Sequence, residues 1–326
     1  MILVTGSAGH LGEALMRVLR GQGLAARGLD IKPSAYTDHV GSIADRDTAR
    51  AAMQGITAVL HAATLHKPHV VTHSAQHFVD TNVSGTLALL EEAVAQGVGA
   101  FVFTSTTSVF GGALTPAPGQ PAAWIDETVT PIPKNIYGAT KLGAEALCEM
   151  IARRDKLNVI ILRTSRFFPE DDDKAATRSR FSRDNIQLLE LIYRRGDVAD
   201  MVSAHLRALE AAPRLGFGRY IVSATSPFTP GDLVELHRDA QAVVTRLYPD
   251  AANLFAASGW QFLPTIDRVY DNRRARNDLG WAPVHDFKHG LQCLRVGRDF
   301  RSALARTIGA RGYHDEVFAD GPYPVD

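Results

Sequence analysis

Residues 1–12 read MILVTGSAGHLG, in which a short apolar run leads directly into three glycines spaced three residues apart. A strand, a glycine-rich turn and a helical pattern in this order are typical of a nucleotide-binding βαβ unit. The first glycine permits a tight turn, the second lets phosphate approach the backbone, and the third lets the helix pack closely on the strand. Phosphate would then lie at the helix N-terminus, where N–H groups favour an anion. This stretch predicts a dinucleotide site.

A second apolar run, from Leu24 to Leu29, ends in Asp30. At this distance from a glycine-rich turn, a carboxylate can accept hydrogen bonds from the hydroxyls of the adenosine ribose. The same carboxylate would repel the 2′-phosphate of NADP, so the sequence predicts NAD as the cofactor. Arg27 and Lys32 are the nearby cations that would oppose this preference.

Length and charge narrow the class of protein. The 326 residues exceed one typical domain, and 35 basic residues balance 35 acidic ones, so no net charge attracts nucleic acid or an anionic membrane. Cys148 and Cys293 cannot form a disulfide framework or a zinc site by themselves, which suits a reducing compartment. No signal peptide precedes the first strand and no apolar run reaches membrane-spanning length, so we expect a cytoplasmic protein that acts on a small molecule.

Strand-like runs alternate with helical patterns through the first half of the chain. We expect strands at Ile2–Thr5, Ala25–Asp30, Ala58–His61, Ala100–Ser105 and Val159–Arg163, and helices near Leu11–Arg20, Ala75–Gln96 and Tyr137–Arg154. This alternation predicts an α/β fold, a Rossmann-type doubly wound parallel sheet with a smaller C-terminal substrate lobe. We place the nucleotide-binding domain at residues 1–166, with a returning segment near 197–223, and the substrate lobe at 167–326.

Tyr137 and Lys141 are four residues apart on an expected helix and therefore share one face. A nearby ammonium stabilises phenolate, so this tyrosine could exchange a proton with a substrate hydroxyl near neutral pH; the alternative is an ordinary surface pair. Upstream, residues 104–108 read TSTTS and end a strand at the carboxyl edge of the sheet, where ligands of such folds bind. A hydroxyl there could hold the reacting oxygen while Tyr137 moves its proton.

Together these motifs resemble the extended short-chain dehydrogenase/reductase family, which includes nucleotide-sugar epimerases and related dehydrogenases. The resemblance covers nearly the whole chain and rests on TGSAGHLG (5–12), HAAT (61–64), NVSGT (82–86), FTSTTSVFG (103–111), YGATK (137–141), RRGDVAD (194–200) and RRARNDLGWAP (273–283). It implies that Thr106 is the catalytic hydroxyl and Tyr137 the acid/base. Lys141 would lower the pKa of Tyr137 and bind the ribose.

The same resemblance implies bound NAD, with Asp30 on the adenosine ribose and the turn at Gly9 to Leu11 on the pyrophosphate. The expected cofactor contacts are Gly6, Gly9, His10, Leu11, Gly12, Asp30, Ser42, Ile43, His61, Ala62, Ala63, Thr64, Asn82, Thr104, Tyr137, Lys141 and Phe167. It also implies a homodimer formed by the helix that carries Tyr137 and its neighbour.

Departures from the family pattern narrow the substrate. Thr107 and Ser108 stand where dehydratases carry an Asp-Glu pair, which argues against dehydration. Arg166 stands where nucleotide-sugar enzymes usually have asparagine, and the segment from Arg166 to Asp197 is short. Both features argue against a substrate that carries a large nucleotide group. The stretch RTSRFFPE (163–170) resembles small-substrate hexuronate dehydrogenases instead.

Basic residues follow this stretch. Arg166 and Arg178, with Arg180 and Arg183 nearby, could bind a substrate carboxylate, and Thr107 is a further expected substrate contact. The alternative is that these arginines are solvated and balance the acidic run Glu170–Asp173.

Four histidines, His66, His69, His73 and His77, lie close together without cysteines or acids at ligand spacing, which favours a solvated loop over a metal site. We therefore expect no metal. The leading hypothesis is an NAD-dependent oxidoreductase that oxidises a secondary alcohol of a small polar substrate similar to a sugar or a sugar acid. The alternatives are an NAD-dependent sugar or nucleotide-sugar epimerase that keeps its cofactor, and an NAD-binding sensor without turnover. The intact Thr106, Tyr137 and Lys141 argue against the sensor.

Overall fold

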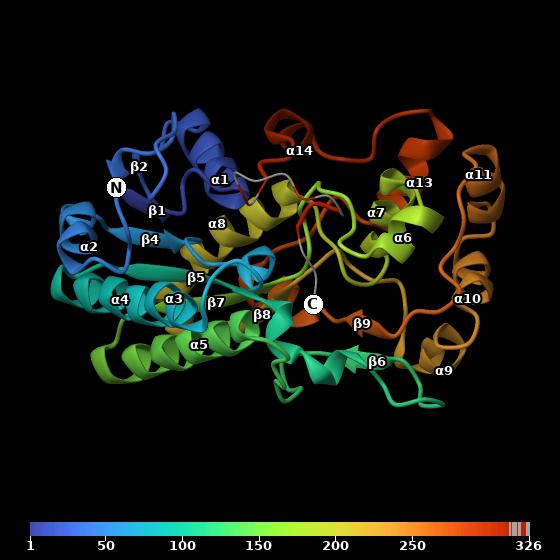
Figure 1. Ribbon diagram of the computed structural model, residues 1–326, viewed down its shortest axis with the longest axis horizontal. Coiled ribbons are helices and arrows are strands. Elements are labelled where there is room, and N and C mark those ends of the chain that lie inside the picture. The colour runs from blue at the N-terminus through green and yellow to red at the C-terminus, as the bar shows by residue number, and fades with distance from the viewer. Residues whose placement is uncertain (313, 315–317, 319–320, 324–326) are drawn as a thin grey trace.

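The computed structural model describes residues 1–312, 314, 318 and 321–323 (Figure 1). Its centre is a seven-stranded sheet in the order β3-β2-β1-β4-β5-β7-β8, with every neighbouring pair parallel. The strands are β1 (Ile2–Thr5), β2 (Ala26–Asp30), β3 (His39–Val40), β4 (Ala58–His61), β5 (Ala100–Thr106), β7 (Val159–Thr164) and β8 (Phe217–Val222). The predicted doubly wound parallel sheet is thus confirmed, and the strand order reverses between β1 and β4, where such folds bind ligands.

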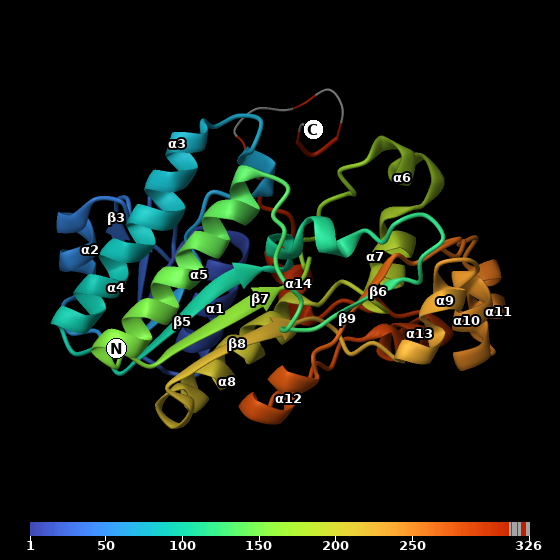
Figure 2. The same ribbon diagram turned by 90° about the horizontal axis from the view of Figure 1, so that it is seen from below.

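Apolar strands explain why the sheet is buried on both faces. Residues 100–103 and 159–162, which read AFVF and VIIL, are buried along their whole length, as expected for central parallel strands covered on each side. One face packs against α1 (His10–Gly21) and α8 (Val198–Leu215). The other packs against α2 (Arg46–Met53), α4 (Gly85–Ala95) and α5 (Ile136–Asp155), as Figure 2 shows.

A smaller lobe lies at the other end of the molecule (Figure 1). It contains a second, two-stranded parallel sheet of β6 (Ala123–Ile125) and β9 (Arg268–Tyr270), which sequence patterns did not predict. A separate apolar core holds this lobe together. Its helices are α6 (Ala175–Arg180), α7 (Arg183–Leu191), α9 (Leu233–Leu236), α10 (Ala240–Leu247), α11 (Ala251–Ala257) and α13 (Phe287–Arg295).

The C-terminal part of the chain is not confined to the smaller lobe. Residues of α12 (Arg273–Leu279), Trp281 and Ile308 of α14 (Ala303–Ile308) belong to the core on the α1 and α8 side of the large sheet. The domain boundary at residue 166 stays a prediction. In the structure, these C-terminal segments return to the core beside the large sheet. In the described part of the chain, none of the helices combines the length and apolarity that a bilayer crossing needs.

The helix predicted over 75–96 is interrupted. It forms as α3 (Ala75–Phe78), a π-helical turn η2 (Val79–Ser84) and α4. Wide π-turns within α-helices often occur at functional sites because they redirect a side chain. Here the turn carries Asn82 toward the carboxyl edge of the sheet.

Candidate active site

The glycine turn after β1 has the tight geometry that the sequence predicted. Gly6 has φ +74°, and a Cβ added to Gly12 would lie 1.8 Å from the Gly6 carbonyl oxygen. Helix α1 starts directly after Gly9, and no side chain caps it. The first N–H groups of a helix lack partners within the helix, so this end can receive an anion. The turn therefore fits the pyrophosphate of a dinucleotide.

Asp30 ends β2 beside this turn. Its Oδ2 accepts a hydrogen bond from the Ala8 N–H at 2.9 Å, and its Oδ1 accepts one from the Lys32 N–H at 2.8 Å. These bonds orient the carboxylate at the adenosine end of the predicted site. Ser42 and Ile43 follow β3, the next strand outward.

Two predicted cofactor residues have hydrogen-bond partners inside the fold. The His61 Nδ1 lies 2.7 Å from Thr5 Oγ1, its Nε2 lies 3.0 Å from Thr86 Oγ1, and the side chain is fully buried. Burial holds its pKa well below the ordinary value. Thr104 Oγ1 lies 2.8 Å from His205 Nε2 on α8. Both side chains thus support the sheet edge from within.

Asn82 joins the segment after β4 to α5. Its Oδ1 accepts hydrogen bonds from the Thr64 hydroxyl at 2.9 Å and the Leu65 N–H at 2.8 Å. Its Nδ2 donates to the Leu65 carbonyl at 2.9 Å and to Thr140 Oγ1 at 3.1 Å. The π-turn thereby fixes the helix that carries Tyr137 and Lys141 against residues 62–65.

Thr106, Tyr137 and Lys141 come together at the carboxyl edge of the sheet. Thr106 ends β5, while Tyr137 lies in the first turn of α5, which Asn135 caps by accepting the Gly138 N–H at 3.0 Å. The Thr106 hydroxyl lies close enough to the Tyr137 phenol to lower its pKa, and Lys141 follows one turn later. All three are buried, with 8%, 6% and 2% of their surface exposed.

Burial sets the electrostatics of these groups. Burial raises the pKa of Tyr137 to about 12, and the Thr106 hydroxyl opposes this rise. Burial also lowers the pKa of Lys141 to about 7, against the attraction of the Glu145 carboxylate. The Lys141 ammonium sits 3.9 Å from the centre of the Phe103 ring. Lys141 is therefore poised to change its charge near neutral pH.

Sequence reasoning missed the buried network behind Lys141. Glu145, one turn further along α5, accepts hydrogen bonds from Ser105 Oγ at 2.6 Å and from Arg163 Nη2 at 2.8 Å. Arg219 Nε lies 3.0 Å from the same carboxylate. The network connects β5, α5, β7 and β8, so it fixes Thr106 relative to Tyr137. Its only sequence signal is the spacing of Glu145 from Lys141.

His66 also lies in the site, so the prediction of a solvated histidine loop is wrong for this residue. Its ring centre is 5.4 Å from that of Tyr137 and 4.7 Å from that of Phe168. Desolvation, together with neighbouring cationic groups, lowers the pKa of His66 to about 3. His77, at the far end of the cluster, is exposed. The described residues contain no group of three or more metal-ligating side chains.

The predicted substrate arginines contact the acidic run. Arg166 Nη1 lies 3.2 Å from Asp172 Oδ2 and 3.5 Å from Asp173 Oδ1, and Asp173 also pairs with Lys67. Arg178 Nη1 donates to the carbonyls of Asp172 and Asp173 at 2.8 and 2.9 Å. These contacts are those expected if the arginines balance the acidic run. A substrate role for Arg166 and Arg178 stays a prediction.

The remaining predicted residues lie beside the catalytic trio or the glycine turn. Thr107 follows Thr106 in the 3₁₀ turn η3 (Thr107–Phe110) and is buried. Phe167 stacks on Phe168 with ring centres 4.3 Å apart and lies 6.0 Å from the ring of His10. This aromatic group covers the N-terminal end of α1.

The family model for the NAD dependent epimerase/dehydratase family matches residues 2–222. The chain belongs to this family. It is 35% identical, over an alignment 345 positions long, to the 3β-hydroxysteroid dehydrogenase/Δ5→4-isomerase of Mycobacterium tuberculosis, with 90% of this chain and 89% of that protein covered. It is 26% identical to a UDP-glucose 4-epimerase of Rhizobium leguminosarum bv. trifolii, with 87% and 93% covered. It spans only 39% of an uncharacterized Sinorhizobium fredii protein, to which it is 34% identical over 166 residues.

Solved structures agree on the fold. A short-chain dehydrogenase/reductase superfamily protein from Agrobacterium tumefaciens, crystallised with NAD, aligns with a TM-score of 0.65 at 24% identity, covering 94% of this chain and 99% of that one. The family is NAD-dependent, so this enzyme uses NAD. The glycine turn and Asp30 would hold its adenosine diphosphate part, and Tyr137 and Lys141 would lie at its reactive end.

Proposed function

We propose that this enzyme oxidises a secondary alcohol of a small, sugar-like substrate. The observation that carries the proposal is the burial of Thr106, Tyr137 and Lys141 together at the carboxyl edge of β5, with Thr106 close enough to Tyr137 to lower the pKa of its phenol. NAD, when bound, supplies the acceptor for the hydrogen that leaves the substrate carbon. Thr106 would hold the substrate oxygen by a hydrogen bond, and Tyr137 would accept its hydroxyl proton. A charged Lys141 would favour the phenolate that this transfer requires.

Charged side chains beside the site support a polar substrate. Lys67, Arg166, Asp172 and Asp173 form mutual ion pairs near His66, which contacts Tyr137. The hydroxyl groups of a sugar can donate hydrogen bonds to the carboxylates and accept them from the lysine and the arginine. A substrate carboxylate would have to displace Asp172 or Asp173 from Arg166.

Two other reactions have specific support. The likeness to a UDP-glucose 4-epimerase over most of the chain supports an epimerase that retains its cofactor. The 35% identity to a 3β-hydroxysteroid dehydrogenase supports a sterol alcohol as substrate. All three reactions begin with the loss of a hydroxyl proton, which the same Tyr137 could accept.

Absorbance of NADH distinguishes these reactions. The purified enzyme is incubated with NAD and, separately, with sugar acids, aldoses, UDP-sugars and a 3β-hydroxysteroid, with Tyr137→Phe as the inactive control. We expect NADH to accumulate with a sugar or sugar acid. Interconversion of UDP-sugars without free NADH would establish the epimerase, and NADH from the steroid alone would establish the sterol dehydrogenase. NAD binding without turnover of any compound would indicate a sensor.

We further propose that the enzyme acts in the cytoplasm as a homodimer that pairs α4 and α5 with their symmetry mates. Exposed apolar side chains support the interface, namely Met150 on α5 at 41% and Val79, the first residue of the π-turn η2 that leads into α4, at 36%. Light scattering of the purified protein should give twice the chain mass. Met150→Glu should lower that mass at micromolar concentration.

A further inference from the structure

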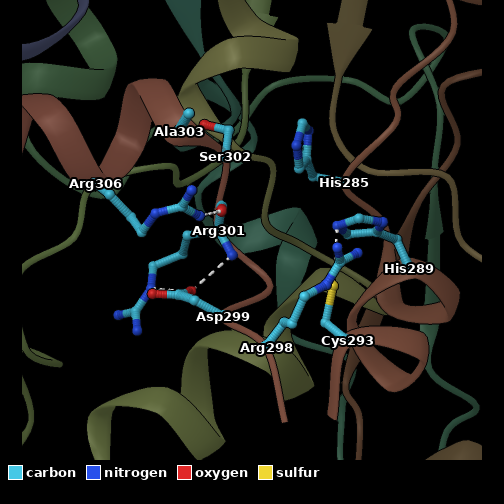
Figure 3. Close-up of a pocket in the computed structure, with 9 residues that line it drawn as sticks. All are labelled: His285, His289, Cys293, Arg298, Asp299, Arg301, Ser302, Ala303 and Arg306. Carbon is cyan, nitrogen blue, oxygen red and sulfur yellow. Dashed lines mark hydrogen bonds and ion pairs between the residues drawn. The ribbon is translucent and has the colours of Figure 1, made fainter. Parts of the chain in front are cut away.

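A cavity of about 440 Å³ that is open to solvent lies apart from Thr106, Tyr137 and Lys141, between α13 and the segment that leads into α14 (Figure 3). Three arginines, Arg298, Arg301 and Arg306, contribute to its wall, together with His285 and His289. Its volume is within the range of ligand pockets, roughly 300–1,000 Å³. None of the motifs discussed above assigns a role to these residues.

Positive side chains outnumber negative ones in the lining of this basic cavity. Asp299 is the one carboxylate of its lining, and Arg301 binds both Asp299 and Asp184 at 2.9 Å. Arg306 donates a hydrogen bond to the Arg301 carbonyl, which leaves its charge unbalanced. Within the described part of the chain, neither Arg298 nor Arg306 forms an ion pair with a carboxylate. Three guanidinium charges against the carboxylates of Asp299 and Asp184 leave one net positive charge to attract an anion.

The histidines add hydrogen-bonding groups to the wall. His285 Nδ1 lies 3.4 Å from Asp200 Oδ2, and His289 Nε2 lies 3.4 Å from Cys293 Sγ. Figure 3 shows the side chains of His289 and Arg298 on one side of the cavity and that of Arg306 on the other. An anion between them could meet donors from two directions.

We propose that this basic cavity binds a small phosphate ester. A phosphate group offers several strong acceptor oxygens, which suit guanidinium groups better than a neutral ligand would. The organic part of the ester would occupy the volume that a bare phosphate leaves. The proposal does not depend on which alcohol the enzyme oxidises, because it concerns binding alone.

The basic cavity adjoins the cofactor end of the molecule without being part of it. Arg301 also lines a smaller cavity that contains His10 and Phe168. The next residue, Ser302, donates its N–H to Asp197 Oδ2 at 2.9 Å, and Asp197 caps α8. A ligand bound to Arg298 and Arg306 would therefore restrain the segment 298–306, which lies beside the N-terminal end of α1.

The test measures binding of glucose 6-phosphate and glycerol phosphate by calorimetry and by thermal unfolding, with glucose as the neutral probe. Saturating NAD is present throughout, so that the pyrophosphate site is filled. We expect saturable binding of the esters, a rise of Tm with ester concentration, and no response to glucose. Arg298→Gln and Arg306→Gln should each weaken ester binding about tenfold, since charge-assisted hydrogen bonds contribute on this scale.

Arg207→Gln is the matched control, because Arg207 is an exposed arginine of α8 paired with Glu210. It should leave ester binding unchanged. Equal weakening in all three variants would reveal a general charge effect and overturn the proposal. Absence of saturable binding at 10 mM ester, or binding that Arg298→Gln and Arg306→Gln leave intact, would overturn it as well. Turnover of an alcohol is not part of the readout, so the proposed function can fail independently.

Discussion

Two arginine–carboxylate networks lie near Tyr137, and they differ in the elements that hold their charged side chains. The inner network joins Glu145 to Arg163, which are 0% and 2% exposed and lie on α5 and β7. The outer network joins Arg166 to Asp172 and Asp173, and its guanidinium is 22% exposed. Regular elements fix the first, whereas a loop supplies the carboxylates of the second. The inner network therefore serves geometry, while the outer one can exchange partners with a substrate.

The largest effect is expected between the two networks, at the phenol itself. Tyr137→Phe removes the proton acceptor but keeps the ring, so kcat should fall about 10²- to 10⁴-fold while NAD affinity changes little. Stopped-flow or steady-state NADH formation gives kcat, and fluorescence titration gives the Kd for NAD. A variant that retains most of the wild-type kcat would show that another group accepts the proton.

Breaking the inner network should mainly reduce stability. Glu145→Ala leaves Arg163 buried without a carboxylate, which we expect to lower the free energy of unfolding by about 3–5 kcal/mol. Glu149→Ala is the matched control, because Glu149 lies one turn further along α5 and its side chain is 31% exposed in its ion pairs. That change should cost less than about 1 kcal/mol. Urea unfolding measures both, and equal losses would remove the distinction between the networks.

Local spacing predicted the parts of the site that lie within one element. The glycine stretch 6–12 and the pair Tyr137 and Lys141 each follow from a few residues, and β1 and β4 have the predicted bounds. The carboxyl edge of a parallel sheet then brings these segments together, because the strands all end on the same side. This predicts a hydroxyl of residues 104–108 near Tyr137, and the family resemblance singles out Thr106, which lies 31 positions away in the sequence.

Contacts between segments that are far apart in the sequence could not be predicted, because no local sequence pattern indicates them. The three-residue strands β6 and β9 pair across more than a hundred residues, and neither is long enough to show alternation. The burial of His66 depends on Phe168, which comes from the loop after β7. Similarly, Glu145 is an ordinary helical acid until Arg163 and Arg219 meet it in the folded chain.

The charge of Lys141 should make the stability of the folded protein depend on pH. Its pKa is about 7 in the folded protein, below the ordinary 10.5, so the unfolded chain binds more protons between these values. Stability contributed by this group should therefore rise as pH increases through 7, by about 2 kcal/mol between pH 7 and pH 9. Lys141→Met should abolish this rise, and Lys134→Met, an exposed lysine, should keep it. Urea unfolding at several pH values provides the comparison, and a rise that survives in Lys141→Met would contradict the assignment.

Cofactor choice should depend on one carboxylate at the far end of the sheet edge. We expect the wild type to bind NAD at least tenfold more tightly than NADP, because Asp30 would repel a 2′-phosphate. Asp30→Asn retains the shape and an oxygen acceptor while it removes the charge, so the preference should shrink by about tenfold, or 1.4 kcal/mol. Equilibrium titration with both cofactors measures this, and equal or tighter NADP binding by the wild type would refute the prediction.

The smallest effect is expected for the outer network, where it also decides the charge of the substrate. Arg166→Ala should cost less than about 1 kcal/mol of stability, because its guanidinium is partly exposed and Asp173 keeps Lys67 as a partner. If a substrate carboxylate displaces Asp172 from Arg166, KM for an acidic substrate should rise about threefold, since an exchange of equivalent partners yields little net energy. KM for the neutral analogue should stay unchanged, and kcat should stay unchanged for both. If kcat instead falls by a larger factor than KM rises, Arg166 would act like the inner network, by fixing the geometry of the site. Equal changes in KM for acidic and neutral substrates would show that the substrate has no carboxylate at Arg166.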